Sequence, residues 1–256
     1  MFCSIELAAR IERAEAELMA ACCGFARPVA GGFATFAEPG SPYNKVAGLG
    51  FDGPADLELV ERDFAERGAP VQVELSQLAD PSLTTQLLDR GYRLEGFENV
   101  LGRALDELPD PVPGIEIRRD HDLESWLALV CDAFSEGDDE GLPSHEEFSR
   151  EAVARALRQM FSGAGAVRYG ALRDGVLAGG GSMRISGGVA QLTGAATAPE
   201  HRRRGVQSAL LAARLRDAAG CEVATVTTSP ASKSQENAQR QGFALLYTRA
   251  IWVKPG

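Results

Sequence analysis

The sequence lacks any apolar stretch long enough to cross a lipid bilayer. Its longest one, Leu18 to Ala26, has nine residues, whereas a membrane-spanning helix needs about 20. A secretory signal peptide is not expected either, because Glu6, Arg10 and neighbouring charges interrupt the apolar core that such a peptide requires. We therefore expect a cytoplasmic protein with no membrane partner.

Cysteine and basic residues are scarce as well. The five cysteines, at positions 3, 22, 23, 131 and 221, form no C-x-x-C pair, which predicts reduced thiols and no metal site. The 26 Lys and Arg residues are outnumbered by 36 Asp and Glu residues, so the net charge is −10. This excess of negative charge argues against nucleic acid as a partner.

Apolar residues make up 45% of the 256 residues and charged residues 24%, a composition typical of a globular protein with a core. Proline is concentrated in the segment Leu108 to Gly114, where three prolines fall within five residues. Such a segment disfavours helix and predicts an extended linker. It divides the chain into residues 1–107 and 115–256, each long enough for a compact domain.

Hydrophobic periodicity predicts a mixed order of helices and strands after the linker. Two helices come first, then three strands joined by hairpin turns, then helix, strand, helix and strand. Ser144 and Glu147 have capping-box spacing at the start of the second helix, and the glycines at 179–181 predict a bulge or bend. The expected helices cover residues 122–134, 144–161, 205–218 and 234–241, and the strands 166–172, 176–185, 189–197, 223–227 and 243–253.

The first part of the chain repeats the later section of this order. A helix over 7–18 precedes strands near 29–37 and 45–51, a helix over 54–67, a strand at 71–75 and a short helix that ends at Gly91. Residues 90–94 line up with residues 241–245, each at a junction of helix, glycine, aromatic residue and strand. Such a junction also arises by chance, but four matching elements in succession favour a tandem duplication.

The chemically informative stretch runs from Thr197 to Leu211, where a strand ends and an apolar helix begins at Gly205. The first N–H groups of a helix are unpaired, and the helix dipole places about half a positive charge there. Glycine lets the backbone come close to a ligand, and the arginines at 202–204 add positive charge. Together these features suit a pyrophosphate; the alternative is a solvated basic loop before a core helix.

Here the sequence resembles the GNAT superfamily of acyl-CoA-dependent N-acyltransferases. Residues 202–207 match the family's phosphate motif, Gln/Arg-x-x-Gly-x-Gly/Ala, except that Gln207 replaces the small final residue. The resemblance covers about residues 115–256. It implies an α/β (α+β) fold with two GNAT-like domains, each a mixed, mostly antiparallel sheet flanked by helices, with residues 1–107 as a degenerate domain and residues 115–256 as the catalytic one.

The resemblance also implies which residues hold acetyl-CoA, the expected co-substrate. Main-chain groups at residues 195–197 would pair with the pantetheine arm, and N–H groups at 203–208 would hold the pyrophosphate. Ser232 stands where many relatives carry an asparagine beside pantetheine; Asn237 and Ser234 could fill that polar role or cap the short helix. The expected ligands are Ala195, Ala196, Thr197, Arg202, Arg203, Arg204, Gly205, Val206, Gln207, Ser208, Ser232 and Asn237.

The acid that protonates the departing thiolate is not evident. In the family it is commonly a tyrosine four residues before the Gly-Phe pair, and this chain has Ala238 at that position. Tyr247 on the last strand is a weak substitute, with packing as its alternative role.

No base can be assigned from the sequence. Gln191, Thr193 and Ala195 are expected to share one strand face, and none of them is a carboxylate. The acidic loop Glu136 to Glu140 is either a wall that attracts a cationic amine or a solvated run of charge.

The leading expectation is an acyl-CoA N-acyltransferase, which transfers acetyl to a small-molecule or peptide amine. The alternatives are a noncatalytic CoA-binding or sensor module, suggested by Ala238, and a scaffold whose first part is an interaction domain. The chain is expected to be a monomer or a homodimer. The first part is expected to lack an acyl-CoA site, because only Asp52 and Gly53 separate its strand from its helix.

Overall fold

The computed structural model describes residues 2–135 and 148–255. These residues form seven α-helices and eleven β-strands, together with a short 3-10 helix at Pro199–His201. The helices are α1 (Ile5–Cys22), α2 (Leu57–Ala65), α3 (Ser82–Asp89), α4 (Leu123–Ser135), α5 (Arg150–Gly163), α6 (Val206–Asp217) and α7 (Lys233–Arg240). The strands are β1 (Phe25–Val29), β2 (Gly32–Phe36), β3 (Lys45–Ala47), β4 (Val71–Ser76), β5 (Arg93–Ala104), β6 (Glu116–Arg119), β7 (Val167–Arg173), β8 (Val176–Ser186), β9 (Val189–Thr197), β10 (Val223–Thr228) and β11 (Ala244–Lys254).

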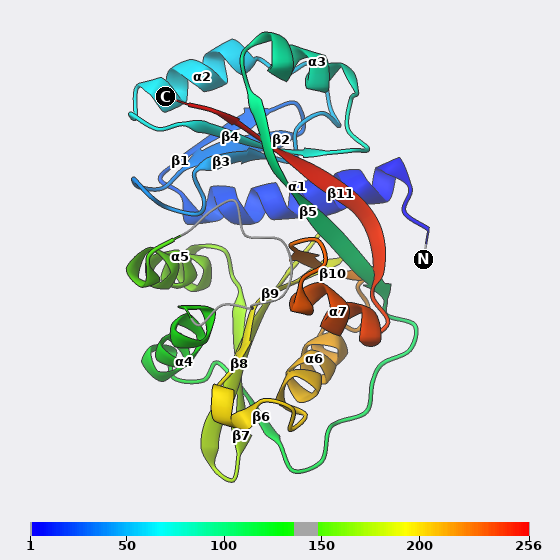
Figure 1. The fold of residues 1–256 in the computed structure, drawn as a ribbon. Helices are drawn as coiled ribbons and strands as arrows, with labels where there is room; N and C mark the ends of the chain where they lie inside the picture. Colours follow the sequence, from blue (N-terminus) through cyan, green and yellow to red (C-terminus); the bar gives the residue numbers. More distant parts are fainter. Residues whose placement is uncertain (1, 136–147, 256) are drawn as a thin grey trace.

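The N-terminal half (residues 1–107) and the C-terminal half (residues 115–256) exchange their last strands. The sheet is continuous, in the order β1-β2-β3-β4-β11-β5-β10-β9-β8-β7-β6. The last strand of the C-terminal half, β11, pairs with β4, while the last strand of the N-terminal half, β5, pairs with β10. The two exchanged strands also pair with each other and cross the molecule diagonally (Figure 1). The expected fold class is confirmed, and the exchange joins the two sheets into one.

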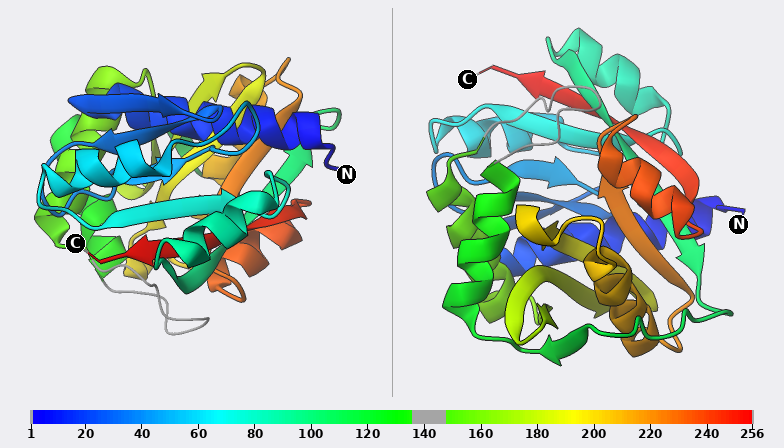
Figure 2. Two further views of the ribbon diagram at one scale, coloured as in Figure 1. Left: turned by 90° about the horizontal axis from the view of Figure 1, so that it is seen from above. Right: turned by 60° about the horizontal axis from the view of Figure 1, so that its bottom comes forward.

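Helices cover both faces of this sheet (Figures 1 and 2). Val100 of β5 packs with Ile11 of α1, whereas its neighbour Leu101 packs with Leu210 of α6. Because adjacent strand residues point to opposite faces, α1 and α6 lie on opposite sides. We call these sides the α1 face, which also carries α4 and α5, and the α6 face, which also carries α2, α3 and α7.

Helix α1 connects the two halves. Its buried residues Leu7 and Ile11 pack with Val100, Val189 and Val223, which come from strands β5, β9 and β10. Burying one such side chain contributes on the order of 1.5–3 kcal/mol. The helix of the N-terminal half therefore covers part of the sheet that belongs to the C-terminal half.

Several expected boundaries are wrong. The N-cap of α5 is Ser149, so the helix begins five residues later than the capping-box pattern indicated; Ser144 and Glu147 lie outside the described residues. Helix α2 begins at Leu57 behind Asp56, and Pro54 is not its first residue. The expected strand near 29–37 is a hairpin of β1 and β2.

The part of the chain that the structure describes contains no helix that is long and apolar enough to span a bilayer.

Candidate functional site

The parallel strands β9 and β10 separate partway along their length. Their pairing runs from Val189–Val223 to Gln191–Thr225, although β9 continues to Thr197 and β10 to Thr228. Beyond Gln191, the described residues give β9 no strand partner on this side. Main-chain groups along that edge are therefore available to an extended ligand, which can add to the sheet as a strand does.

A bulge in β9 lies at the level where β9 and β10 separate. Gly180 pairs with Ala196 and Ser182 with Thr193, so two β9 residues stand opposite one residue of β8, and Gly194 has a φ of +55°. Thr193 contacts Met160 on the α1 face, and Ala196 packs there too. The extra residue reverses the alternation of side chains. Ala195 therefore does not share a face with Gln191 and Thr193, and that expectation is wrong.

Residues 202–208, which we call the cradle loop, follow the end of β9. Gly205 has a φ of +81° and is the N-cap of α6, and no side chain of the described residues caps the helix. Arg203 is also left-handed, with a φ of +60°. A left-handed residue next to a right-handed one, such as Gly205 before the helical Val206, turns successive N–H groups toward one point, which creates a concavity that binds anions. The N–H groups of the first α6 turn are free to bind such an anion.

The glycines of β8 hold the start of α6 against the sheet. A Cβ on Gly179 would lie 2.6 Å from Val206 Cγ1 and 2.8 Å from the carbonyl oxygen of Ala196. On the other face, a Cβ on Gly180 would lie 2.7 Å from Trp126 Nε1. Glycine at these positions thus lets α6 and α4 approach β8 closely, which places the cradle loop beside the free edge of β9.

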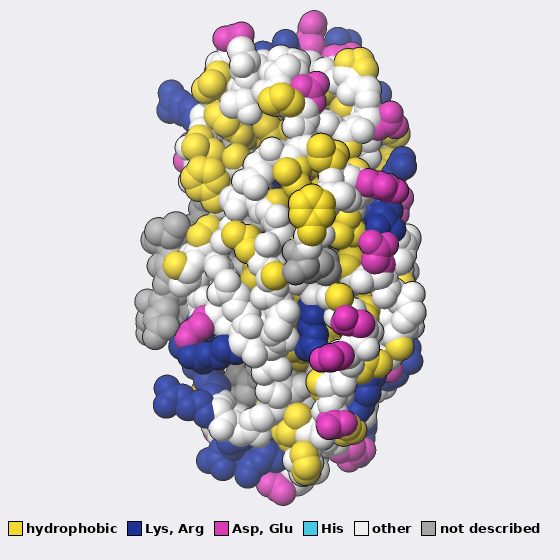
Figure 3. All heavy atoms as spheres, turned by 90° about the vertical axis from the view of Figure 1, so that its right-hand side faces the viewer, with side chains coloured by type: hydrophobic (Ala, Val, Ile, Leu, Met, Phe, Trp, Pro, Cys, Tyr) yellow, Lys and Arg dark blue, Asp and Glu magenta, His cyan; other side chains and the backbone are white. Residues whose placement is uncertain are grey.

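The structure brings most of the predicted ligands together in one region. Arg202, Arg203, Arg204 and Gln207 are exposed, whereas Val206 is buried. The first turn of α6 contains no acidic residue, so nothing in it repels an anion. In Figure 3, Lys and Arg side chains gather at the lower left of the face shown, on the C-terminal half.

Residues 195–197 form the free edge of β9. The side chain of Ala196 is buried, while Ala195 and Thr197 are half-buried. Thr197 Oγ1 is buried with no hydrogen-bond partner among the described residues. Ser208, in the first turn of α6, accepts a hydrogen bond from Gln241 Nε2 at 3.4 Å, which links the cradle loop to the end of α7.

The predicted residues on α7 have different surroundings. Ser232 is the N-cap of this helix, and its Oγ accepts a hydrogen bond from the Gln235 N–H at 3.2 Å. Asn237 is exposed, and Ala238 packs on the core beneath α6. The capping role that the sequence left open for Asn237 and Ser234 is thus filled by Ser232.

Tyr247 lies in the core. It is 1% exposed and packs between Val100 and α1. Burial, and then the nearby carboxyl of Glu12, raise the pKa of Tyr247 well above its ordinary value. A buried phenol with such a pKa is a poor proton donor, so the structure argues against the acid role that the sequence suggested.

A buried cluster of charged residues, which the sequence analysis did not identify, lies on the α1 face. Arg249, which is completely buried, donates from Nε to Glu12 Oε1 at 2.7 Å and is also ion-paired with Glu15. Lys45 pairs with Glu74 at 2.6 Å. We call this group, completed by Glu98, the acidic cluster. Its members are Glu12, Glu15, Lys45, Glu74, Glu98 and Arg249.

Glu98 is the most chemically suggestive member of the acidic cluster. Its side chain is 23% exposed, and its Oε2 lies 3.9 Å from Arg249 Nη1. The pKa of Glu98 is raised to about 7, mainly by burial and next by the negative charge of Glu74. Charged residues within apolar strands, such as Glu74 between Val73 and Leu75, were the signal that could have revealed this cluster.

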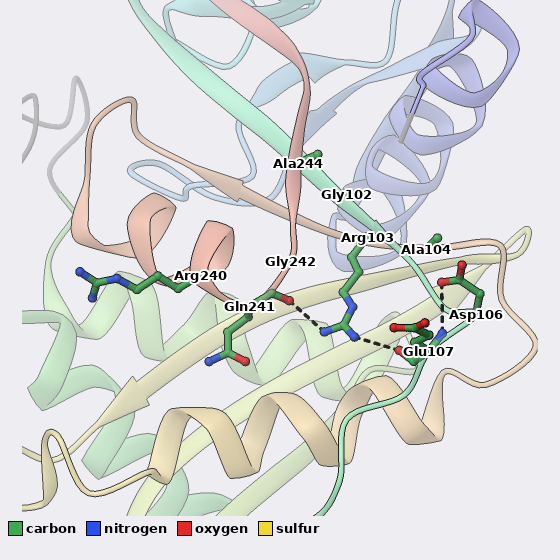
Figure 4. Close-up of a pocket in the computed structure, with 9 residues that line it drawn as sticks. All are labelled: Gly102, Arg103, Ala104, Asp106, Glu107, Arg240, Gln241, Gly242 and Ala244. Carbon is green, nitrogen blue, oxygen red and sulfur yellow. Dashed lines mark hydrogen bonds between the residues drawn. The ribbon is translucent and has the colours of Figure 1, made fainter.

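A hollow of about 520 Å³ lies between the ends of β5 and α7 and the start of β11 (Figure 4). Arg103 crosses it and donates to the carbonyl oxygens of Gln241 at 2.9 Å and Glu107 at 2.8 Å. None of the predicted CoA ligands lines this hollow. Among the described residues, no group of His, Cys, Asp and Glu is arranged to hold a metal ion.

Comparisons with known proteins agree with this geometry. The profile of the acetyltransferase (GNAT) family matches residues 123–243. A search of curated protein sequences finds no significant match.

Solved structures with a similar fold extend the likeness to the whole chain. A GCN5-related N-acetyltransferase from Kribbella flavida has a TM-score of 0.71 at 20% identity, over 98% of this chain and 96% of that one. A tandem GNAT protein from the clavulanic acid biosynthesis pathway has a TM-score of 0.55 at 16% identity, over 77% and 66%. A functionally unknown protein from Staphylococcus epidermidis has a TM-score of 0.58 at 14% identity, over 78% and 79%. At these identities the likeness is one of fold.

Proposed function

We propose that this protein, whose residues 123–243 form a domain of the acetyltransferase (GNAT) family, transfers an acetyl group from acetyl-CoA to the nitrogen of an amine. The observation that carries the proposal is the proximity of two unsatisfied main-chain surfaces, the edge of β9 beyond Gln191 and the start of α6 at Gly205. An extended ligand that ends in phosphates can satisfy both surfaces at once.

The two surfaces match the two ends of acyl-CoA. The amides of the pantetheine arm can pair with residues 195–197 along the edge of β9. The pyrophosphate suits the N–H groups of the cradle loop, where the dipole of α6 and the exposed arginines favour negative charge. Gln207 is exposed, so its side chain is free to turn away from the phosphates, and the departure from the family motif is compatible with binding.

The bulge in β9 supports the proposal because it supplies main-chain donors for the chemical step. Gly194 and Ala195 have no partner in β8, and the described part of β10 does not pair with them. An N–H group at this position can stabilise the oxyanion that forms when the amine attacks the thioester. Holding amine and thioester in one cleft supplies much of the remaining rate.

Titration calorimetry and a transfer assay test the proposal on the full chain. We expect CoA to bind at one equivalent per chain, and acetyl-CoA to be consumed in the presence of at least one member of a panel of aliphatic, aromatic and peptide amines. Binding of CoA without turnover on any amine would favour the noncatalytic CoA-binding module, for which the absence of a hydroxyl at Ala238 is the motivation. Absence of CoA binding would overturn both functions.

A further inference from the structure

The exchanged strand β5 carries Glu98 to the end of the sheet where β9 and β10 separate. Asn99 is the last β5 residue that pairs with β10, opposite Thr228, and Glu98 lies just past it along the same edge. Val100 points to the α1 face, so Glu98, two residues away on the same strand, points there as well. Its position opposite Arg249 in the register agrees with this orientation.

Glu98 lies at the level of the gap between β9 and β10. A chain that pairs with β9 in this gap lies two strand spacings of about 4.8 Å, or about 10 Å in all, from the β5 backbone. The Glu98 side chain spans part of that distance, and an acceptor nitrogen that lies over β10, with one water molecule, spans the rest. An acyl chain whose phosphates lie at the start of α6 enters from the α6 face, so its acyl end is directed toward the α1 face, where Glu98 lies.

The acidic cluster has unsatisfied polar atoms on the side of Glu98. Arg249 Nη1 and Glu74 Oε2 are both buried without a hydrogen-bond partner among the described residues, and they lie 3.7 Å apart. The same Nη1 is 3.9 Å from Glu98 Oε2. A bound water molecule or substrate group beside Glu98 would satisfy both atoms, because it can accept from the guanidinium and donate to the carboxylate.

The charge of the acidic cluster favours a cation. Four carboxyl groups face two cationic side chains, and Glu15 and Glu98 are each about one fifth exposed. The substrate of an N-acyltransferase is an ammonium ion in solution, and this surplus of carboxylates attracts it.

We propose that Glu98 is the base that accepts the proton of the acceptor's ammonium group, so that the N-terminal half completes the active site of the C-terminal half. This inference rests on the proposed function. An N–H bond of the ammonium breaks, and its proton passes to the Glu98 carboxylate directly or through one water molecule. The freed lone pair forms the C–N bond at the thioester carbon and the C–S bond breaks. The departing thiolate takes the second nitrogen proton, and Glu98 returns the first to solvent.

The environment of Glu98 suits this task. A general base is most effective when its pKa is near the working pH, and the pKa of Glu98 is raised to about 7. Burial and the charges of Glu74 and Glu15 raise it, while Lys45 and Arg249 oppose them. Glu12, on the next turn of α1, completes the set of charged neighbours and is itself paired with Arg249.

The test compares three variants of the full chain in acetyl transfer from acetyl-CoA. Glu98→Gln keeps the shape of the side chain and removes the base, so we expect kcat/KM to fall at least ~100-fold. Glu98→Asp keeps a carboxylate and should restore part of this loss. Glu95→Gln, at an exposed position of the same strand, is the matched control and should behave as wild type. The dissociation constant of CoA should change less than about twofold in all three, because the cradle loop is untouched.

The pH profile gives a second readout that needs no substitution. The kcat/KM of the wild type should fall on the acidic side with an apparent pKa near 7 that is the same for acceptor amines of different basicity. Glu98→Gln should lose this limb. Wild-type kcat/KM in Glu98→Gln, or a wild-type profile without the limb, would overturn the inference and leave the proposed function intact. Absence of transfer to any amine by the wild-type protein would instead overturn the proposed function, and the inference with it.

Discussion

In each half of the molecule one helix connects two parallel strands, and the two halves differ in how this helix begins. At the start of α2, the side chain of Asp56 accepts a hydrogen bond from the Leu59 N–H at 3.0 Å, and Glu58 lies in the first turn. At the start of α6, Gly205 has no side chain to do this, and the first turn has no acid. The N-terminal half therefore satisfies its helix with its own carboxylates, whereas the C-terminal half leaves the same groups to a ligand.

The loops before these helices differ in the same way. Between β3 and α2, the N–H groups of Gly50, Phe51 and Asp52 all point to the carbonyl oxygen of Ala30. These N–H groups, which a phosphate would need as donors, are thus already bonded to Ala30 of the same half. We propose that the N-terminal half binds no CoA and that its contribution is structural and, through Glu98, catalytic. A duplicated fold can keep its shape and lose its ligand when its own groups occupy the donors.

The largest effect is expected from a side chain at the start of α6. In Gly205→Val, a β-branched residue would have to adopt a φ of +81°, and its Cβ would lie 3.3 Å from Val112 Cγ1. We expect the affinity for CoA, measured by calorimetry, to fall at least ~100-fold.

The matched control for this substitution is Gly220→Val. Gly220 has a φ of +95°, and a Cβ at this position would meet no atom within 4 Å, so the backbone strain is similar while the cradle loop is unchanged. This variant should bind CoA within about twofold of wild type. Equal CoA affinity in the two variants would contradict the assignment of the cradle loop.

The next effect is one of stability alone. Asp56→Ala removes the side-chain cap of α2 and should cost about 1 kcal/mol of unfolding free energy. Ser149→Ala, which removes the equivalent bond to the Ala152 N–H at 3.2 Å in α5, should cost a similar amount. Denaturant unfolding measures both. Neither variant should change the stoichiometry of CoA binding, because Ala30 still engages the loop donors; a second equivalent bound by Asp56→Ala would contradict the comparison.

The sequence predicted the local elements of the candidate site better than the arrangement of strands around it. The bounds of β9 and the start of α6 at Gly205 follow from local signals, namely alternation, a turn and a glycine, and these residues form the cradle loop. Strand exchange cannot be predicted from such local signals. The alternation of buried and exposed residues in β5 and β11 would be the same whichever strand each of them pairs with. Glu98 was missed for the same reason, since its neighbours come from α1, β3, β4 and β11 and meet only when the sheet is assembled.

A smaller effect concerns how the free energy of unfolding depends on pH. The pKa of Glu98 rises from 4.5 to about 7 on folding, so between these values the folded chain holds a proton that the unfolded chain has lost. The contribution of Glu98 to stability is therefore present below about pH 4.5 and is lost as the pH rises toward 7. The neighbouring Glu12 titrates in the same direction and Glu15 in the opposite one.

Comparison with Glu98→Gln isolates this contribution. Denaturant unfolding at several pH values between about 4 and 8 should show that the wild type loses stability relative to Glu98→Gln across the window. Glu95→Gln, which alters an exposed carboxylate of the same strand, should follow the wild type. A constant difference between wild type and Glu98→Gln at all pH values would contradict the burial of a proton at Glu98.

The smallest effect is expected at Tyr247, whose comparison with Glu98 tests the consequence of the strand exchange. Tyr247 lies on β11, the strand that the C-terminal half gives to the other half's sheet, and its hydroxyl is buried without a hydrogen-bond partner among the described residues. Tyr247→Phe removes that unsatisfied group and keeps the ring packed against Val100, so kcat should stay within about twofold of wild type and the free energy of unfolding should not fall. A large loss of kcat with unchanged CoA affinity would show that the hydroxyl reaches the departing thiolate, and the acid would then lie on β11. If the expected result is obtained, water in the cleft delivers the proton. The side chain on which turnover depends is then Glu98, on β5, the strand that the C-terminal half receives in the exchange.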